Sequence, residues 1–189
     1  MPETNDIFEI MSTMRAMRRL KPDPVPDELI NKILQAGQWA PSGGNTQRWR
    51  FLVVKDPEVK KKVQVYYKRL FDESVGPRYA SSAPPPGSDA ARYKRQHAAV
   101  EYLTDHYHEA PVWIVACLEG GENPGRTAGS SIYPAVQNMC SAAIRMGRRI
   151  ASPENATRQA AVASSRCSRC LMFPALKFPR LSSKACLLL

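Results

Sequence analysis

The feature that most limits the possible folds is an apolar strand in the second half of the chain, set between helical patterns. Residues 110–119, APVWIVACLE, form a short apolar run that predicts a buried strand. A second strand is predicted at 50–57, RFLVVKDP, which ends in an Asp-Pro turn. Apolar residues at helical spacing predict helices over 7–20, 26–41, 58–75, 89–108 and 132–147. Because helices and strands alternate without a repeat, we expect a three-layer α/β or α+β domain.

Length and composition are those of one globular domain. The chain has 189 residues, of which 43% are hydrophobic, and this is enough to bury a core. No apolar run approaches the roughly 20 residues that span a bilayer. The first residues, MPETNDIFEI, lack the uninterrupted apolar core of a signal peptide. We therefore expect a cytoplasmic protein with reduced thiols and no membrane contact.

The net charge of +10 is concentrated at the C-terminus. Residues 148–189 contain eight basic residues and one acidic residue, which leaves +3 for residues 1–147. Such a distribution is weak support for nucleic-acid binding by the folded part. We expect no nucleic-acid partner, and binding through the basic tail stays as an alternative.

The character of the sequence changes after Gly147. Residues 148–189 have no clean hydrophobic period and hold three of the five cysteines. We therefore divide the chain into a folded domain, 1–147, and an atypical basic tail, 148–189, for which disorder is an alternative. Cys167 and Cys170 form one CxxC pair, and without a second pair we expect no metal site. Cys186 stands fourth from the end, as a prenylated cysteine would. A match of this kind, followed only by Leu-Leu-Leu, arises easily by chance, so it is no basis for predicting prenylation.

The connection WAPSGGNTQRW, 39–49, is suited to contact with a polar ligand. Its glycines let the backbone approach a ligand closely and adopt positive φ. Ser42 and Asn45 offer polar side chains beside backbone N–H donors, which together can form a concavity for an anion or an amide. The alternative is a plain capped connection, in which proline ends the helix and Gly-Gly or Asn-Thr makes the turn. By composition alone the alternative is the commoner case. A second connection, 76–89, predicts a surface loop or lid.

A basic cluster precedes this connection in the predicted helix 7–20. Arg15, Arg18 and Arg19 are three and four residues apart, so on a helix they share a face. Guanidinium groups on one face can hold a phosphate by bidentate hydrogen bonds. The alternative is a solvated basic face that is favourable at the negative end of the helix dipole.

Taken together in this order, the segments resemble the FMN-dependent nitroreductase family. The resemblance lies in RAMRRLKPDPVPDELINKILQAGQWAPSGGNTQRWRFLVV, APVWIVACLE and SSIYPAVQNMCSAAIRMG, and covers about residues 12–147. It implies an α+β fold of the nitroreductase type, a three-layer α/β/α sandwich with a mixed, mostly antiparallel sheet and flanking helices.

The resemblance also implies where FMN is held. The residues matching the family's phosphate-binding segment are Arg15, Arg18 and Arg19, and those matching the loop along the flavin are Pro41, Ser42, Gly43, Asn45 and Gln47. Ala16 departs from the serine that the family commonly has after its arginine. Trp49 and Phe51 match positions that pack the strand into the core.

The family resemblance further implies an NAD(P)H-dependent oxidoreductase. NAD(P)H would reduce FMN, and an acceptor such as a nitroaromatic or quinone would then take its place. The flavin carries the redox chemistry, so no side chain is assigned as catalytic. The family usually forms a two-fold homodimer, and the helix at 132–147 resembles one used in that contact.

After Gly147 the chain departs from the family pattern. Family members continue with a segment over the flavin and a further strand, whereas RMGRRIASPENATRQ breaks from that pattern. We therefore expect the sheet to lack the usual C-terminal strand. Our hypothesis is that the sequence beyond about residue 147 comes from a shifted reading frame. The alternative function is then a non-catalytic chain with weak or no flavin binding.

Overall fold

The computed structural model describes residues 6–84, 86–119, 128–147 and 185–188. These residues form two compact units, each described by itself. Unit 1 holds the described residues of 6–17, 23–54 and 112–188, and unit 2 holds 18–22 and 55–111. No helix of the described residues combines the length and the apolar character that a membrane crossing needs.

Unit 1 contains a sheet of three antiparallel strands in the order β1-β2-β3. Strand β1 spans Trp49–Val54, β2 spans Trp113–Leu118 and β3 spans Ala185–Leu188. The two strands predicted at 50–57 and 110–119 are confirmed, and they pair with Trp49 opposite Leu118 and Val54 opposite Trp113.

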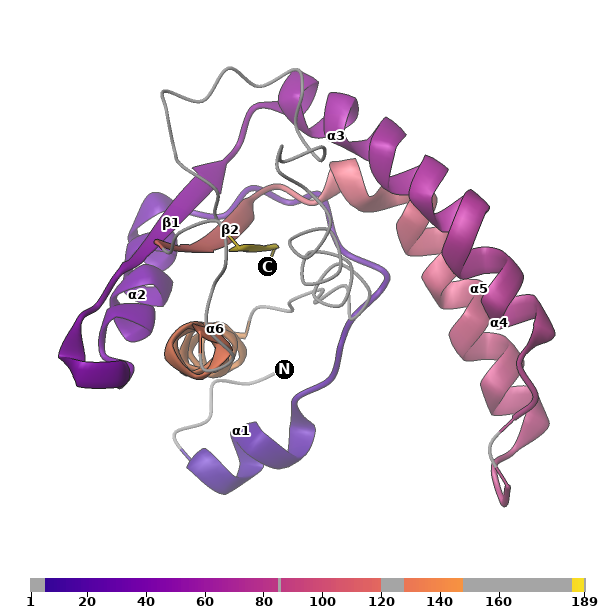
Figure 1. The fold of residues 1–189 in the computed structure, drawn as a ribbon, viewed down its shortest axis with the longest axis horizontal. Helices are drawn as coiled ribbons and strands as arrows, with labels where there is room; N and C mark the ends of the chain where they lie inside the picture. Colours follow the sequence, from indigo (N-terminus) through magenta and orange to yellow (C-terminus); the bar gives the residue numbers. More distant parts are fainter. Residues whose placement is uncertain (1–5, 85, 120–127, 148–184, 189) are drawn as a thin grey trace. The chain divides into compact units, whose positions relative to one another are not determined.

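Strand β3 lies in the C-terminal region, where the sequence predicted no strand of its own. Residues 185–188 pair antiparallel with β2, with Leu188 opposite Val115 and Ala185 opposite Leu118 (yellow in Figure 1). The four-residue run has no period-2 pattern from which a strand could be predicted. It pairs because β2 offers an edge beside it, and such pairing is set by contacts distant in the sequence. The rest of the tail, 148–184, lies outside the described residues.

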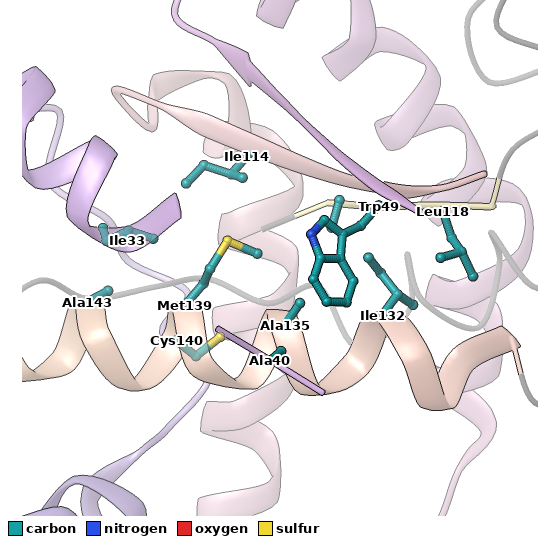
Figure 2. Packing of buried hydrophobic residues seen from close by; sticks show 11 residues of the cluster. Ile33, Ala40, Trp49, Ile114, Leu118, Ile132, Ala135, Met139, Cys140 and Ala143 are labelled. Atoms are coloured by element: carbon teal, nitrogen blue, oxygen red, sulfur yellow. The ribbon is translucent and has the colours of Figure 1, made fainter. Parts of the chain in front are cut away.

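Two helices, α2 (Asp27–Gln38) and α6 (Ala128–Arg145), form a layer on one face of this sheet (Figure 1). Between sheet and helices lies the main apolar cluster, in which Ala116, Ala135 and Met139 are fully buried. Figure 2 shows Met139 and Ala135 of α6 facing Trp49 and Ile114 of the strands. The α+β class is confirmed.

A close approach of α2 to α6 depends on Gly37. A Cβ atom added at Gly37 would lie 2.9 Å from Cγ of Met139 and 3.3 Å from Cζ of Phe51. Trp49 is buried and Phe51 packs against the same cluster, as predicted for both. Only a residue without a side chain allows this spacing between α2, α6 and β1.

The limits of α6 differ from the prediction. The sequence predicted a start at 132, but the helix begins at Ala128 and continues through Pro134. Proline is usual in a first helical turn and removes a hydrogen bond when it lies further inside. Pro134 is tolerated here because α6 is held by burial of Ile132, Ala135 and Met139 on its inner face.

Helix α1 (Ile7–Thr13) ends seven residues earlier than predicted, which corrects the helix expected over 7–20. The hydroxyl group of Thr13 donates to the carbonyl oxygen of Glu9 at 2.7 Å, and that of Ser12 donates to the same carbonyl at 3.1 Å. Met14 then adopts extended geometry at the C-cap. Side-chain hydroxyls that bond to helix carbonyls compete with the helix, so the chain leaves it here although apolar residues continue at helical spacing.

Unit 2 consists of helical segments. They are α3 (Pro57–Leu70), the π-helical turn η2 (Phe71–Val75), α4 (Gly76–Ser81), α5 (Ala90–His106) and the 3₁₀ turn η3 (Tyr107–Glu109). The helices predicted at 58–75 and 89–108 are confirmed. The loop predicted at 76–89 is shorter than expected, because α4 takes up residues 76–81.

Polar contacts join α3 to α5 and to the residues that follow η3. The ammonium group of Lys60 donates to the carbonyl oxygen of Ala110 at 2.6 Å, and the amide of Gln64 donates to that of Thr104. Lys60 is only 4% exposed. A lysine is rarely buried to this extent unless its charged group is bonded, as it is here. Burial lowers the pKa of Lys60, and the nearby Asp56 carboxylate offsets part of the effect.

Candidate functional site

The candidate site is the connection between α2 and β1, which the sequence singled out at 39–49. It contains one 3₁₀ turn, η1 (Gly43–Asn45), and most of its residues are exposed. Pro41, Gly43, Asn45 and Gln47 are exposed, and Ser42 is half-buried. Unit 1 therefore brings together all five loop residues that the sequence predicted.

The backbone of this loop is held in an unusual conformation. Gly44 has φ of 59°, which glycine adopts without strain. Asn45 and Gln47 also have positive φ, 52° and 47°, and they are the only non-glycine residues of the described chain that do. Asparagine tolerates this region, but a long side chain such as glutamine rarely occupies it. Strained residues of this kind cluster at ligand sites, so the observation favours binding by this loop.

Several backbone N–H groups of the loop are already bonded inside the protein. The N–H of Gln47 donates to Oγ of Ser42 at 3.0 Å, and the N–H of Asn45 donates to the carbonyl oxygen of Ser42 at 2.9 Å. The N–H of Thr46 donates to the carbonyl oxygen of Gly43. The predicted concavity of free backbone N–H groups is therefore replaced by a self-bonded turn. What the loop offers to a ligand is the side chains of Asn45 and Gln47 on a rigid support.

Helix α6 fixes this loop through two polar side chains that the sequence analysis missed. The N–H of Gly43 donates to Oγ of Ser131 at 3.2 Å, and Nδ2 of Asn138 donates to the carbonyl oxygen of Ala36 at 3.2 Å. Ser131 and Asn138 are seven residues apart, so they lie on nearly the same side of the helix. Their spacing on a helix with small residues was the available signal. Both ends of the α2-to-loop segment are thereby bonded to one rigid element.

The far end of the loop is joined to the residue after β2. The N–H of Glu119 donates to the carbonyl oxygen of Arg48 at 2.7 Å, and the Glu119 carboxylate forms an ion pair with Arg50 at 3.0 Å. The loop is thus bonded to α6 through Ser131 and to Glu119, the residue after β2. This anchoring keeps Asn45 and Gln47 in place before any ligand arrives.

The three arginines of the basic segment do not share a helix face, which corrects the geometry predicted for them. Helix α1 ends before them, and Nη1 of Arg15 donates to the carbonyl oxygens of Ser12 and Met14 at 2.8 and 2.7 Å. Arg15 thereby binds carbonyl groups at the C-terminal end of α1, as a cation does favourably there. Among the bonds within the described residues, Arg15 uses only Nη1, so Nε and Nη2 remain for an anion.

Arg18 and Arg19 belong to unit 2. The guanidinium carbon of Arg19 lies 4.3 Å from the ring centroid of Tyr102, a cation–π contact. The pKa of Tyr67 is raised, mainly by burial, and the Arg18 charge is among the smaller influences that lower it. Arg15, Arg18 and Arg19 therefore have different neighbours: helix carbonyl groups, the surroundings of Tyr67 and the ring of Tyr102.

Metal binding has no support in the described residues, where no three His, Cys, Asp or Glu side chains gather. Cys167 and Cys170 lie outside the described residues.

Comparison with known proteins agrees with these features. The model of the nitroreductase family matches residues 12–148, which include α2, the loop and α6. Iodotyrosine deiodinase 1 of Sus scrofa is 32% identical over 116 residues, covering 59% of this chain and 36% of that protein. The curated relatives extend well beyond the match, since this chain spans between 19% and 52% of their length.

Solved structures share the fold. A nitroreductase with bound FMN from Desulfitobacterium hafniense DCB-2 has a TM-score of 0.66 and 21% identity, covering 98% of this chain and 88% of that one. Oxidised iodotyrosine deiodinase bound to FMN and 3-iodo-L-tyrosine has a TM-score of 0.57 and 21% identity, covering 74% and 70%.

Proposed function

The chain belongs to the nitroreductase family, and on that premise we propose that it is an FMN-dependent oxidoreductase. It would pass reducing equivalents from NAD(P)H to a small acceptor such as a nitroaromatic or a quinone. The observation that carries the proposal is the family match over 12–148, because that range contains the strained loop and the helix that anchors it. Residues 1–147 would form the FMN-binding part.

The residues of the loop fit a flat, polar-edged cofactor. Gly43 and Gly44 add no bulk on the exposed side, and a Cβ at Gly43 would meet only Oγ of Ser131, at 3.4 Å. Asn45 and Gln47 carry amides that both donate and accept, as the mixed nitrogens and oxygens of an isoalloxazine rim require. Pro41 and Ser42 complete the set, with Ser42 bonded to the Gln47 backbone.

The phosphate of FMN requires a cation, for which the three arginines are proposed. Arg15 keeps Nε and Nη2 for two parallel hydrogen bonds to phosphate oxygens while Nη1 stays on the helix carbonyls. Arg18 and Arg19 remain proposals from the family pattern. The serine absent at Ala16 removes one further donor.

When bound, FMN supplies the hydride and electron transfer. The chain's own contribution is to bind, orient and preorganise. Ser131 and Asn138 act as positioning residues, because they hold the backbone that carries Asn45 and Gln47. No side chain is assigned an acid or base role.

The first test is flavin retention. The purified chain is mixed with FMN, desalted and examined by absorbance near 450 nm, the region where oxidised flavins absorb; retained bands support the proposal. Gln47→Gly removes the amide at a positive-φ position that glycine prefers, so it should weaken FMN binding without lowering Tm. Ser131→Ala should weaken binding through the loop, whereas Ser141→Ala, which loses only a bond to the Gln137 carbonyl, should not. A folded chain that retains no FMN would favour the non-catalytic alternative.

Turnover tests the finer proposal. NADH and NADPH are compared with nitroaromatic and quinone acceptors, and their consumption is followed. The basic-tail alternative would appear instead as nucleic-acid binding that weakens steeply with salt and requires residues 148–189.

A second candidate reaction is reductive deiodination of an iodotyrosine. The observation that favours it is the match to iodotyrosine deiodinases. In this reaction a C–I bond is replaced by C–H, with uptake of two electrons and a proton and release of iodide. Iodide release from 3-iodo-L-tyrosine by the reduced, FMN-loaded chain tests it; turnover of quinones without iodide release would reject it.

We also propose that the chain acts as a homodimer, as the family resemblance implies. Helix α1 leaves Phe8 and Met11 77% and 58% exposed, and such apolar side chains suit burial against a second copy. Light scattering of the FMN-loaded chain measures the oligomeric state; a monomer at micromolar concentration would contradict this.

A further inference from the structure

The C-terminal end of α1 is anchored to α6 through the side chain of Met14. Nε2 of Gln137 in α6 donates to Sδ of Met14 at 3.3 Å, and Met14 also packs against the main apolar cluster, to which α6 contributes. One turn earlier in α1, Ile10 is only 4% exposed, and the two helices are in contact (Figure 1). A thioether sulfur is a weak acceptor, so the bond from Gln137 gives direction to a contact that is mainly apolar.

Arg15 is the residue directly after this anchor. Met14 leaves the helix in extended geometry, and its carbonyl oxygen accepts from Nη1 of Arg15 at 2.7 Å. The same nitrogen donates to the carbonyl oxygen of Ser12 at 2.8 Å. The guanidinium group is therefore bonded to the short segment that Gln137 ties to α6, and its position depends on that tie.

Building on the FMN-binding function proposed above, we propose that Gln137 acts through Met14 to position Arg15 for the phosphate of FMN. Because the Gln137 amide donates to Met14, its effect reaches the cofactor through Arg15, which makes it a positioning residue. Helix α6 then supports two parts of the binding machinery by separate bonds. Ser131 holds the loop, and Gln137 holds the segment that carries the arginine.

Preorganisation is the physical reason for such an anchor. An arginine side chain has many rotamers, and ordering them when a phosphate binds lowers the affinity. The bonds from Nη1 restrict the Arg15 side chain in advance, provided that the segment which accepts them is itself held in place. Loss of the Gln137 bond should therefore weaken the grip on phosphate and leave contacts with the flavin ring unchanged.

The experiment compares FMN with riboflavin, which has the same ring and ribityl chain but no phosphate. The fluorescence of each flavin is followed as the full chain is added, which gives both dissociation constants. Gln137→Leu should raise the Kd for FMN about two- to tenfold, the range for one hydrogen bond, without changing the Kd for riboflavin. Met14→Leu, which keeps an apolar side chain of similar size but no sulfur, should do the same. The control is Gln96→Leu, at an exposed position of α5, which should change neither Kd.

Two further variants identify the route of the effect. Arg15→Ala should bring the Kd for FMN close to that for riboflavin, and Gln137→Leu added to it should cause no further change, because both act on the same contact. Ser131→Ala should instead weaken the binding of both flavins, because it acts on the loop.

A measurement without flavin tests the anchor by itself. Trypsin cleaves after arginine, and it should cut after Arg15 faster in Gln137→Leu than in the wild type, because the segment leaves α6 more often. Equal cleavage in the two chains would overturn the inference whether or not the chain binds flavin. An equal loss of affinity for FMN and riboflavin in Gln137→Leu would also overturn it. A wild type that binds neither flavin would overturn the proposed FMN function and this role of Gln137 with it, and the cleavage rates would still distinguish that failure from a failure of the anchor.

Discussion

The two units of this protein are held together by different means. The core of unit 1 is apolar and close-packed, with Met139, Ala135 and Ala116 fully buried between sheet and helices. In unit 2 buried polar side chains of α3 bond to the elements beside it, Gln64 to Thr104 of α5 and Lys60 to Ala110 after η3, and the buried apolar cluster around Phe71 is small. The stability of unit 1 should therefore depend on how closely its apolar side chains fit together. The stability of unit 2 should depend on individual hydrogen bonds.

The largest effect is expected for Met139→Ala in unit 1. Met139 is fully buried against Gly37 and Phe51, so truncation leaves a cavity and should lower the free energy of unfolding by about 2–5 kcal/mol. Urea denaturation measures the change, and Val65→Ala, at a 66% exposed position of α3, is the control. The control should stay within about 0.5 kcal/mol of wild type.

A double-mutant cycle with Gly37 sharpens this result. Gly37→Ala alone should destabilise, because its methyl group would lie 2.9 Å from Cγ of Met139. In the Met139→Ala background that contact is gone, so the added methyl group should be tolerated or stabilising. Simple additivity of the two changes would show that α2 and α6 do not depend on this fit.

The corresponding test of unit 2 is Lys60→Met. The change keeps an apolar stem of similar length but leaves the carbonyl groups of Ala110 and Pro111 without the ammonium donor. We expect a loss of about 2–3 kcal/mol, as for other hydrogen bonds made by charged groups. Lys61→Met, at the next and exposed position of α3, is the control. A Lys60 variant as stable as wild type would mean that unit 2 rests on apolar contacts after all.

These residues also show how far sequence reasoning reached. Helix α2 and strand β2 were predicted because their burial follows a local apolar pattern, and the loop 41–47 was found from its glycines and polar residues. The burial of Lys60 was missed, since nothing local distinguishes it from Lys61 or Lys62. The end of α1 was missed because Ser12 and Thr13 bond back to Glu9 while apolar spacing continues. Strand β3 depends on pairing with β2, which is distant in the sequence, and no local pattern contains that. The spacing of Ser131 and Asn138 was visible in the sequence, but their distant partners, Gly43 and Ala36, were not.

Alkaline pH should affect unit 1 through Cys140. Burial raises the pKa of this thiol from 9.0 to about 11. An acid whose pKa is raised on folding contributes stability that is present below pH 9 and is lost as the pH rises through 11. The free energy of unfolding of the wild type, measured relative to that of Cys140→Ala, should therefore fall by about 2 kcal/mol between pH 8 and pH 11.

The comparison of two variants at each pH removes the effect of other groups. Tyr107 of unit 2 also has a raised pKa because of burial, and it titrates equally in both chains. Urea denaturation at several pH values, with a reductant present, gives the difference. A difference that does not change with pH would show that the thiol is not buried in solution.

The smallest effect concerns Arg15 of unit 1 and Arg19 of unit 2. Arg19 contacts the ring of Tyr102 in unit 2, and Arg15 bonds to the carbonyls at the end of α1 in unit 1. Arg19→Ala should lower the free energy of unfolding by about 0.5–1 kcal/mol, the usual size of an exposed cation–π contact. Hydrogen exchange should show lower protection in α5 for Arg19→Ala and lower protection in α1 for Arg15→Ala. If both variants loosened the same helix, the two arginines would act together without FMN, as the helical-face model had predicted, and the division between the units at Arg18 would be wrong.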